Sequence, residues 1–258
     1  MPSKMTSKDD FLKEITSLLS SSGESRIILK NIQEAISLSQ KVKELFYLDG
    51  FSSNEKEEKL FSSSSDMVSF CSKNISLKLK GDTINIYAGY FRNSNTAQTG
   101  CGIIACDGDT PLFSLGAYYS EVETLAEVEL KSIFLSLKIC SGLVSSTKAE
   151  INIFSFAEYP IQAITVWAHT WKKNGWRKRG GAIKNLKTIQ ESFDLYNILS
   201  KRINFSVVPY KKKSDNTDDG DTVASRLKEV EKNMLFKAKN VGEEVVSQKT
   251  RIGKIKFP

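Results

Sequence analysis

A basic segment, residues 172–187, carries the residue types that hold a polyanion. It contains seven Lys and Arg residues and no acidic residue. Cationic side chains neutralise phosphates and release counterions, and Arg can contact phosphate oxygens in a bidentate manner. The sequence therefore predicts a nucleic-acid-binding surface, made by Lys172, Lys173, Trp176, Arg177, Lys178, Arg179, Lys184 and Asn185.

Three tryptophans lie in or beside this basic segment. Trp167 and Trp171 are four residues apart, a spacing at which side chains pack along one face of a helix. Trp176 lies among the cations and is as well suited to stacking on a base as to packing. We therefore expect Trp167 and Trp171 to be structural, and both roles stay open for Trp176.

Cysteine and histidine chemistry has little support in the sequence. The four cysteines, Cys71, Cys101, Cys106 and Cys140, form no closely spaced pair, and His169 is the single histidine. Zinc sites need such closely spaced ligands. We expect four buried free thiols, a packing role for His169, and no zinc centre.

Length and composition indicate a folded protein with an anionic partner. The chain has 258 residues, is 40% hydrophobic and carries a formal charge of +7. This content is too apolar for a wholly disordered chain, and no apolar run is long enough to span a membrane. We expect no membrane association and an intracellular location, nuclear or cytoplasmic, because the N-terminal residues have no apolar signal core.

The predicted elements fall into three regions. Amphipathic helices are predicted at residues 8–21 and 26–47, and a serine-rich stretch at 50–66 resembles a linker, so residues 1–75 form a helical N-terminal region. Residues 76–238 form the main domain. Residues 239–258 form a basic C-terminal tail. The N-terminal helices are predicted to cap the main domain or to attach a protein partner.

The main domain reads as a mixed sheet covered by helices, in the α/β class. After strand-like alternation at 76–79, five strands are predicted at residues 83–87, 100–106, 111–117, 150–156 and 203–209. Helices are predicted at residues 121–140, 160–171, 186–200 and 221–238. The first three strands suit an antiparallel meander, and the long helix after them allows a later strand to run parallel.

This order of elements resembles the ribonuclease H fold, and one segment makes the resemblance specific. Residues 164–176 (ITVWAHTWKKNGW) are similar to the helix and basic protrusion of type 1 ribonuclease H, and residues 182–186 (AIKNL) are similar to the start of that family's next helix. The resemblance covers roughly residues 83–236. It implies a five-stranded mixed sheet flanked by helices, here preceded by a small α-helical region, and contact with RNA–DNA hybrids.

The family cuts the RNA strand of such hybrids with two divalent ions, which the resemblance implies are held by four carboxylates. The first position falls on Gly89 and the third on Phe156, so both lack an oxygen ligand. Glu129 matches the second position, with Glu127 as a less well-phased alternative, and Asp221 matches the fourth. Glu158 and Asp82 are the acidic residues nearest to the replaced positions, and neither is well placed to substitute.

Three functions follow from this pattern. The leading one is a ribonuclease H-like protein without catalysis and without a metal cofactor, which binds an RNA–DNA hybrid or another duplex through the basic segment. The second is a divergent Mg²⁺-dependent ribonuclease H that retains Glu129 and Asp221 as ligands. The third is a structural subunit that docks within a larger complex.

Overall fold

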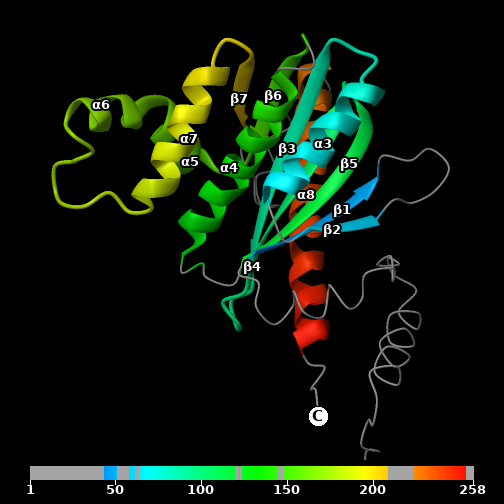
Figure 1. Cartoon of the computed structure of the whole chain (residues 1–258), viewed down its shortest axis with the longest axis horizontal. Coiled ribbons are helices and arrows are strands. Elements are labelled where there is room, and N and C mark those ends of the chain that lie inside the picture. Colours follow the sequence, from blue (N-terminus) through cyan, green and yellow to red (C-terminus); the bar gives the residue numbers. More distant parts are fainter. Residues whose placement is uncertain are drawn as a thin grey trace, which may run out of the picture.

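One seven-stranded mixed sheet organises the molecule. The computed structural model describes residues 44–50, 58–61, 64–119, 122, 124–144, 148–208 and 223–253. The strands lie in the order β2-β1-β5-β4-β3-β6-β7 (Figure 1). Their bounds are β1 Glu44–Gly50, β2 Glu58–Phe61, β3 Thr83–Arg92, β4 Thr99–Asp107, β5 Thr110–Tyr119, β6 Glu150–Ser155 and β7 Ile203–Val207.

Strands β3 to β7 are the five predicted strands, so the ribonuclease H-like topology is confirmed. β3, β4 and β5 form the predicted antiparallel meander, and β6 pairs parallel with both β3 and β7. The crossover from β5 to β6 is α4, Leu125–Val144. Thr124 caps α4, because its hydroxyl accepts a hydrogen bond from the Glu127 amide at 3.2 Å.

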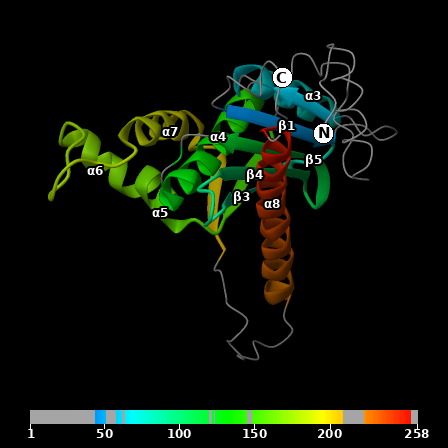
Figure 2. The ribbon, with the colours of Figure 1, turned by 90° about the horizontal axis from the view of Figure 1, so that it is seen from below.

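Helices cover both faces of the sheet. Figure 2 shows α8, Val223–Gly253, on the face opposite α4 and α3, Ser64–Lys78. Between β6 and β7 the chain forms α5 Glu158–Gln162, a π-helical turn Ala163–Trp167, α6 Ala168–Lys173 and α7 Leu186–Leu199. In Figure 1, α6 and the chain that follows it project away from the sheet.

Glycines allow α8 to lie directly on the sheet. Gly89, Gly102 and Gly116 are register partners across β3, β4 and β5, and together they form a row that we call the glycine row. A Cβ atom added at Gly102 would lie 1.7 Å from the carbonyl oxygen of Ala238 in α8. The helix backbone therefore approaches the strands more closely than any larger residue would permit.

The structure corrects the prediction for residues 44–79. Residues 44–47 were expected to be helical and 50–66 to be a linker, but β1 pairs antiparallel with β5 and β2 pairs with β1. The alternating segment 76–79 begins within α3, whose Met67, Cys71 and Ile75 are fully buried in the main core. These residues recur every four positions, a helical period that the serine-rich start of the segment obscured. The predicted helices before residue 44 lie outside the described residues.

The C-terminal region also differs from the prediction. The last helix was expected to end near Ala238 and to be followed by a basic tail, but α8 continues to Gly253. Val245 and Val246 are buried against Tyr118 of β5, so at least this part of the predicted tail belongs to the packed domain. In the described part of the chain, every helix is either too short or too polar to cross a membrane.

Candidate nucleic-acid interface

A cavity of about 380 Å³ opens where the basic segment meets the body of the domain. One side is aromatic and is formed by Tyr159, Trp167 and Trp171. The lining also includes two cations, Lys178 and Lys184. The remaining lining residues are Thr124, Ala126, Ile183 and Asn185. The cavity therefore joins flat apolar rings to positive charge.

The three rings form one continuous surface, which we call the aromatic wall. The centroids of Tyr159 and Trp167 lie 5.9 Å apart, and those of Trp167 and Trp171 lie 5.8 Å apart. Both pairs are tilted, by 58° and 52°. Both tryptophans are half-buried, so each ring packs against its neighbour and also faces the cavity. The expectation that Trp167 and Trp171 pack along one helix face is confirmed.

Phe193 of α7 anchors the projecting helix α6. The rings of His169 and Trp176 contact it edge-on, with centroids at 4.9 Å and 5.9 Å, and Lys172 Nζ lies 5.2 Å from its centroid. His169 therefore packs against an aromatic ring, as expected. Trp176 adopts a left-handed backbone with φ of 60°, and its amide donates to the Trp171 carbonyl at 2.6 Å. This geometry places Trp176 as an anchor of the basic segment.

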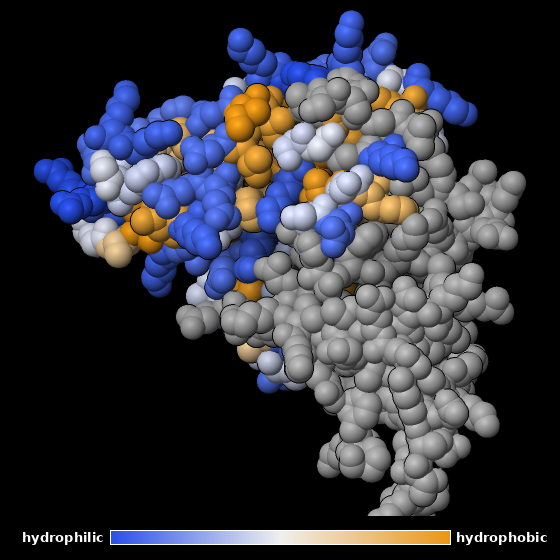
Figure 3. Space-filling view, viewed as in Figure 1, coloured by the Kyte–Doolittle hydropathy of each residue, from blue (hydrophilic) through white to orange (hydrophobic). Residues whose placement is uncertain are grey.

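The predicted cations divide into two groups. Lys178 and Lys184 line the cavity together with Asn185, which adopts a left-handed backbone with φ of 56°. The structure does not bring the others into the cavity lining. Lys173, Arg177 and Arg179 are exposed, and Figure 3 shows a largely hydrophilic surface over the projecting part of the molecule.

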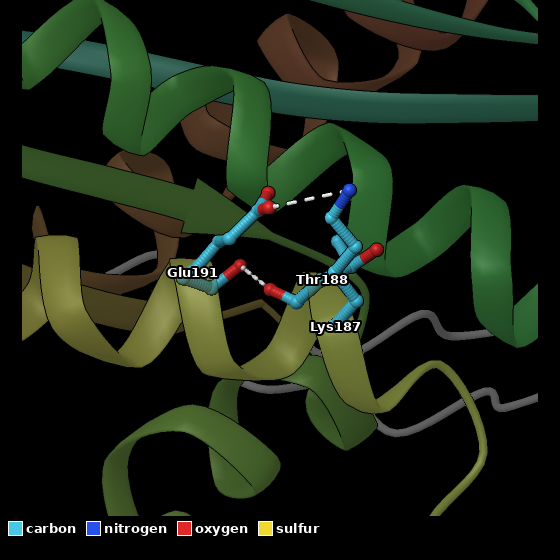
Figure 4. Close-up of polar contacts among 4 residues, drawn as sticks. Lys187, Thr188 and Glu191 are labelled. Atoms are coloured by element: carbon cyan, nitrogen blue, oxygen red, sulfur yellow. Dashed lines mark hydrogen bonds and ion pairs between the residues drawn. The ribbon is translucent and has the colours of Figure 1, made fainter.

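Two cations of the basic segment lie beside acidic side chains of α7. Lys172 Nζ is 3.6 Å from a carboxylate oxygen of Asp194, and both side chains are largely exposed. Lys187 reaches Glu191 one turn further along α7, at 3.9 Å (Figure 4). Ser192 donates to the Thr188 carbonyl within that helix. Exposed ion pairs of this kind contribute little free energy.

The two positions where the resemblance placed missing carboxylates lie side by side and face α8. Ala88 pairs with Ser155 in the parallel register of β3 and β6, so Gly89 and Phe156 follow at the same level. A Cβ atom at Gly89 would lie 2.3 Å from the backbone nitrogen of Lys239. The Phe156 ring packs on Phe236, with centroids 5.3 Å apart. One turn of α8 therefore fills the space beside both positions.

Glu129 lies in α4, on the other face of the sheet from Gly89. Burial raises the pKa of its carboxyl group, and a hydrogen bond from the Tyr90 hydroxyl partly opposes this shift in pKa. Burial raises the pKa of the Tyr159 hydroxyl, and the Glu129 charge adds to the shift. Glu129 is thus a half-buried carboxylate held by a neighbouring tyrosine.

The described residues do not fit a pair of divalent ions. Glu127 lies in the capped first turn of α4, and Glu158 accepts a hydrogen bond from Gln162 at 2.6 Å. Within the described ranges, His, Cys, Asp and Glu side chains form no group of three or more that could hold a metal. Asp221, the predicted fourth ligand, lies outside the described residues.

Sequence reasoning found the cations of the cavity but missed part of its aromatic wall. Tyr159 was not identified, because it comes before the helix predicted at residues 160–171. Packing was the favoured role for Trp167 and Trp171. The four cysteines are buried and free, as expected.

Comparison with known proteins gives consistent matches. A family model for RNase H matches residues 80–228, which is more than half of the chain. A ribonuclease H from Schizosaccharomyces pombe is 29% identical over 132 residues, which cover 51% of this chain and 45% of the relative. The chain thus matches less than half the length of that relative.

Solved structures are also among the matches. One is LC9-RNase H1, a type 1 RNase H with the type 2 active-site motif, which is 17% identical, with a TM-score of 0.41 and coverage of 58% of this chain and 72% of that chain. Another is the N-terminal RNase H domain of a Mycobacterium tuberculosis protein, which is 15% identical with a TM-score of 0.39. That match covers 66% of this chain and 99% of the other.

Proposed function

Since this chain belongs to the RNase H family, we propose that it is a non-catalytic member that binds nucleic acid, an RNA–DNA hybrid or another duplex, through the basic segment. The observation that carries the proposal is the cavity, which is lined by the aromatic wall together with Lys178 and Lys184. Cations attract the phosphate backbone, and ring faces give apolar or stacking contact to sugars and bases. Lys173, Arg177 and Arg179 extend the positive surface beyond the cavity.

The contacts of α8 support the absence of catalysis. Paired-ion catalysis needs closely placed carboxylates that clamp the attacking and leaving oxygens. Gly89 has no side chain to supply an oxygen, and Phe156 supplies an apolar ring that is packed on Phe236. A helix backbone stands where a first carboxylate would project. No catalytic step is therefore assigned to the described residues.

Binding is tested with labelled hybrid, double-stranded RNA and double-stranded DNA at several salt concentrations. The variant Lys178→Ala/Lys184→Ala should bind at least tenfold more weakly, and its log–log salt slope should fall by about 0.7–0.9 for each phosphate contact that is lost. The matched control, Lys148→Ala/Lys201→Ala, removes two exposed lysines outside the basic segment and should bind as the wild type does. Equal affinity of both double variants would contradict the proposal.

Hybrid cleavage is the competing activity, and membership of the RNase H family is the observation that favours it. The assay incubates purified protein and hybrid with Mg²⁺ or Mn²⁺. We expect no cleavage above that of a protein-free sample. Cleavage that disappears in both Glu129→Gln and Asp221→Asn would instead establish a divergent enzyme.

A further inference from the structure

The helix that carries the aromatic wall contains one turn of π-helix, Ala163–Trp167, between α5 and α6. In this turn the amide of Ala168 donates to the carbonyl of Ala163, five residues earlier. A π-helical turn inside an α-helix accommodates one extra residue, and such turns are frequent at functional sites.

The extra residue changes where the three rings lie around the helix axis. An α-helix turns by about 100° per residue, so a regular helix would place Trp167 about 80° and Trp171 about 120° away from Tyr159. Absorbing one residue in the π turn makes the spacings equivalent to seven and eleven residues. The two tryptophans then lie within about 20° of Tyr159 on the helix surface. The observed ring contacts, at 5.9 Å and 5.8 Å, agree with this alignment.

The packing on both sides prevents the helix from relaxing by rotation. Before and within the turn, Ile161 and Ile164 are buried in the core. After it, Ala168 is fully buried, and His169 packs on Phe193. The extra residue must therefore be absorbed between these anchors.

Two residues of the turn are suited to this purpose. The hydroxyl of Thr165 donates to the Ile161 carbonyl at 2.8 Å and thereby supplies a partner to a carbonyl beside the widened turn. Val166 is 58% exposed, so the additional side chain points to solvent instead of disturbing the core.

We propose that the π turn positions the aromatic wall, with Thr165 as a positioning residue, so that Tyr159, Trp167 and Trp171 face the cavity together. The role of the wall in binding rests on the proposed function. The alignment of the three rings does not depend on the proposed function, and it can be measured without any nucleic acid.

The decisive variant is deletion of Val166. It should convert the turn into regular α-helix while the three rings keep spacings of seven and eleven residues, so the dissociation constant for duplex should stay within twofold of the wild type. Insertion of one Ala between Thr165 and Val166 should rotate both tryptophans out of the wall and weaken binding at least fivefold. Val166→Ala, which keeps the chain length, is the control for the loss of the side chain.

A spectroscopic readout tests the alignment independently. In a Tyr159→Trp/Trp171→Phe background, the ring pair at positions 159 and 167 should give an exciton couplet in circular dichroism. The couplet should persist when Val166 is deleted and vanish when Ala is inserted. If the wild type binds no nucleic acid, the proposed function fails while the couplet still tests the alignment.

Thermal unfolding identifies variants that do not fold. If the insertion variant does not fold, the couplet of the deletion variant alone tests the alignment of the rings. Loss of the couplet in a folded deletion variant, or its survival in a folded insertion variant, would overturn the proposal.

Discussion

Gly89 bears on two features, the expected position of a metal ligand and the packing of α8 on the sheet. Gly89 has no side chain at the position where the resemblance implies a first carboxylate, and as a member of the glycine row it admits the backbone of α8 at Ala238 and Lys239. Phe156 acts in the same direction, because its ring packs on Phe236 of the same helix. Introducing acidic residues at these two positions would therefore conflict with the packing of α8 on the sheet.

We predict that Gly89→Asp/Phe156→Asp does not create hybrid cleavage and strongly destabilises the protein. The Asp side chain at position 89 would collide with helix backbone, and overpacking of this kind costs about 1–3 kcal/mol or more. Chemical denaturation measures the loss. Asn95→Asp is the control for an added carboxylate, because it places the charge on an exposed turn. Cleavage by the double variant would show that α8 can move aside.

Glu129 should make stability depend on pH in a defined direction. Its pKa is raised by burial in the folded state, so the folded protein binds this proton more tightly than the unfolded chain does. The stability that the protonated group contributes is present below the unfolded pKa and is lost as pH rises through the folded pKa. Glu129→Gln should therefore raise the melting temperature at neutral pH and leave it nearly unchanged at pH about 4. Equal shifts at both pH values would argue against a raised pKa.

At the scale of elements, the strands with strong local patterns were predictable and the segments defined by distant partners were not. Thr83–Arg92 and Glu150–Ser155 show β-branched and apolar residues that mark them as strands. The segment Glu44–Gly50 has a short apolar run that suits helix or strand equally, and its pairing with β5 decides between them. The π turn has no local signature, because it results from anchors on both sides.

The second half of α8 escaped prediction for a related reason. Some of its contacts with the sheet are made by the small residues Ala238 and Gly242, and a glycine within a helical pattern weakens the prediction of a helix. The partners of these residues are glycines on three strands. Only the three-dimensional fold brings the two sets together.

The glycine row should respond to alanine in a graded manner. An added Cβ would lie 1.7 Å from the nearest atom at Gly102, 2.3 Å at Gly89 and 3.0 Å at Gly116. We therefore expect the loss of unfolding free energy to follow the order Gly102→Ala, Gly89→Ala, Gly116→Ala, with the first exceeding about 3 kcal/mol and the last near 1 kcal/mol. Urea denaturation measures each. A flat series would show that α8 shifts freely on the sheet.

The C-terminal half of α8 should contribute to stability as part of the core. Ending the chain after residue 240 removes the buried Val245 and Val246, and burial of each such side chain is worth about 1.5–3 kcal/mol. The shortened protein should lose several kcal/mol of unfolding free energy. Ending the chain after residue 253 is the matched control and should leave stability unchanged. Equal stability of the two would restore the original assignment of a basic tail.

For the whole molecule, the domain extends beyond the region that matches its family. The family match begins at residue 80, yet α3 places Met67, Cys71 and Ile75 in the main core, and β1 pairs along β5. Without these elements the sheet would end at β5, with unpaired backbone groups, and a cavity would open beneath α4. Unpaired sheet edges favour association with other chains.

We therefore predict that a fragment of residues 44–258 is monomeric and folds cooperatively, whereas a fragment of residues 80–258 aggregates or unfolds at a much lower temperature. Truncating a large buried apolar side chain to Ala costs about 2–5 kcal/mol. Removing three fully buried apolar side chains should therefore cost most of the unfolding free energy of a typical domain, which is about 5–15 kcal/mol. Light scattering and thermal unfolding distinguish the two fragments. Both retain the basic segment, so nucleic-acid affinity serves as an internal check that the longer fragment is native. Similar stability of both would show that the matched region is self-sufficient and that β1, β2 and α3 are an accessory layer.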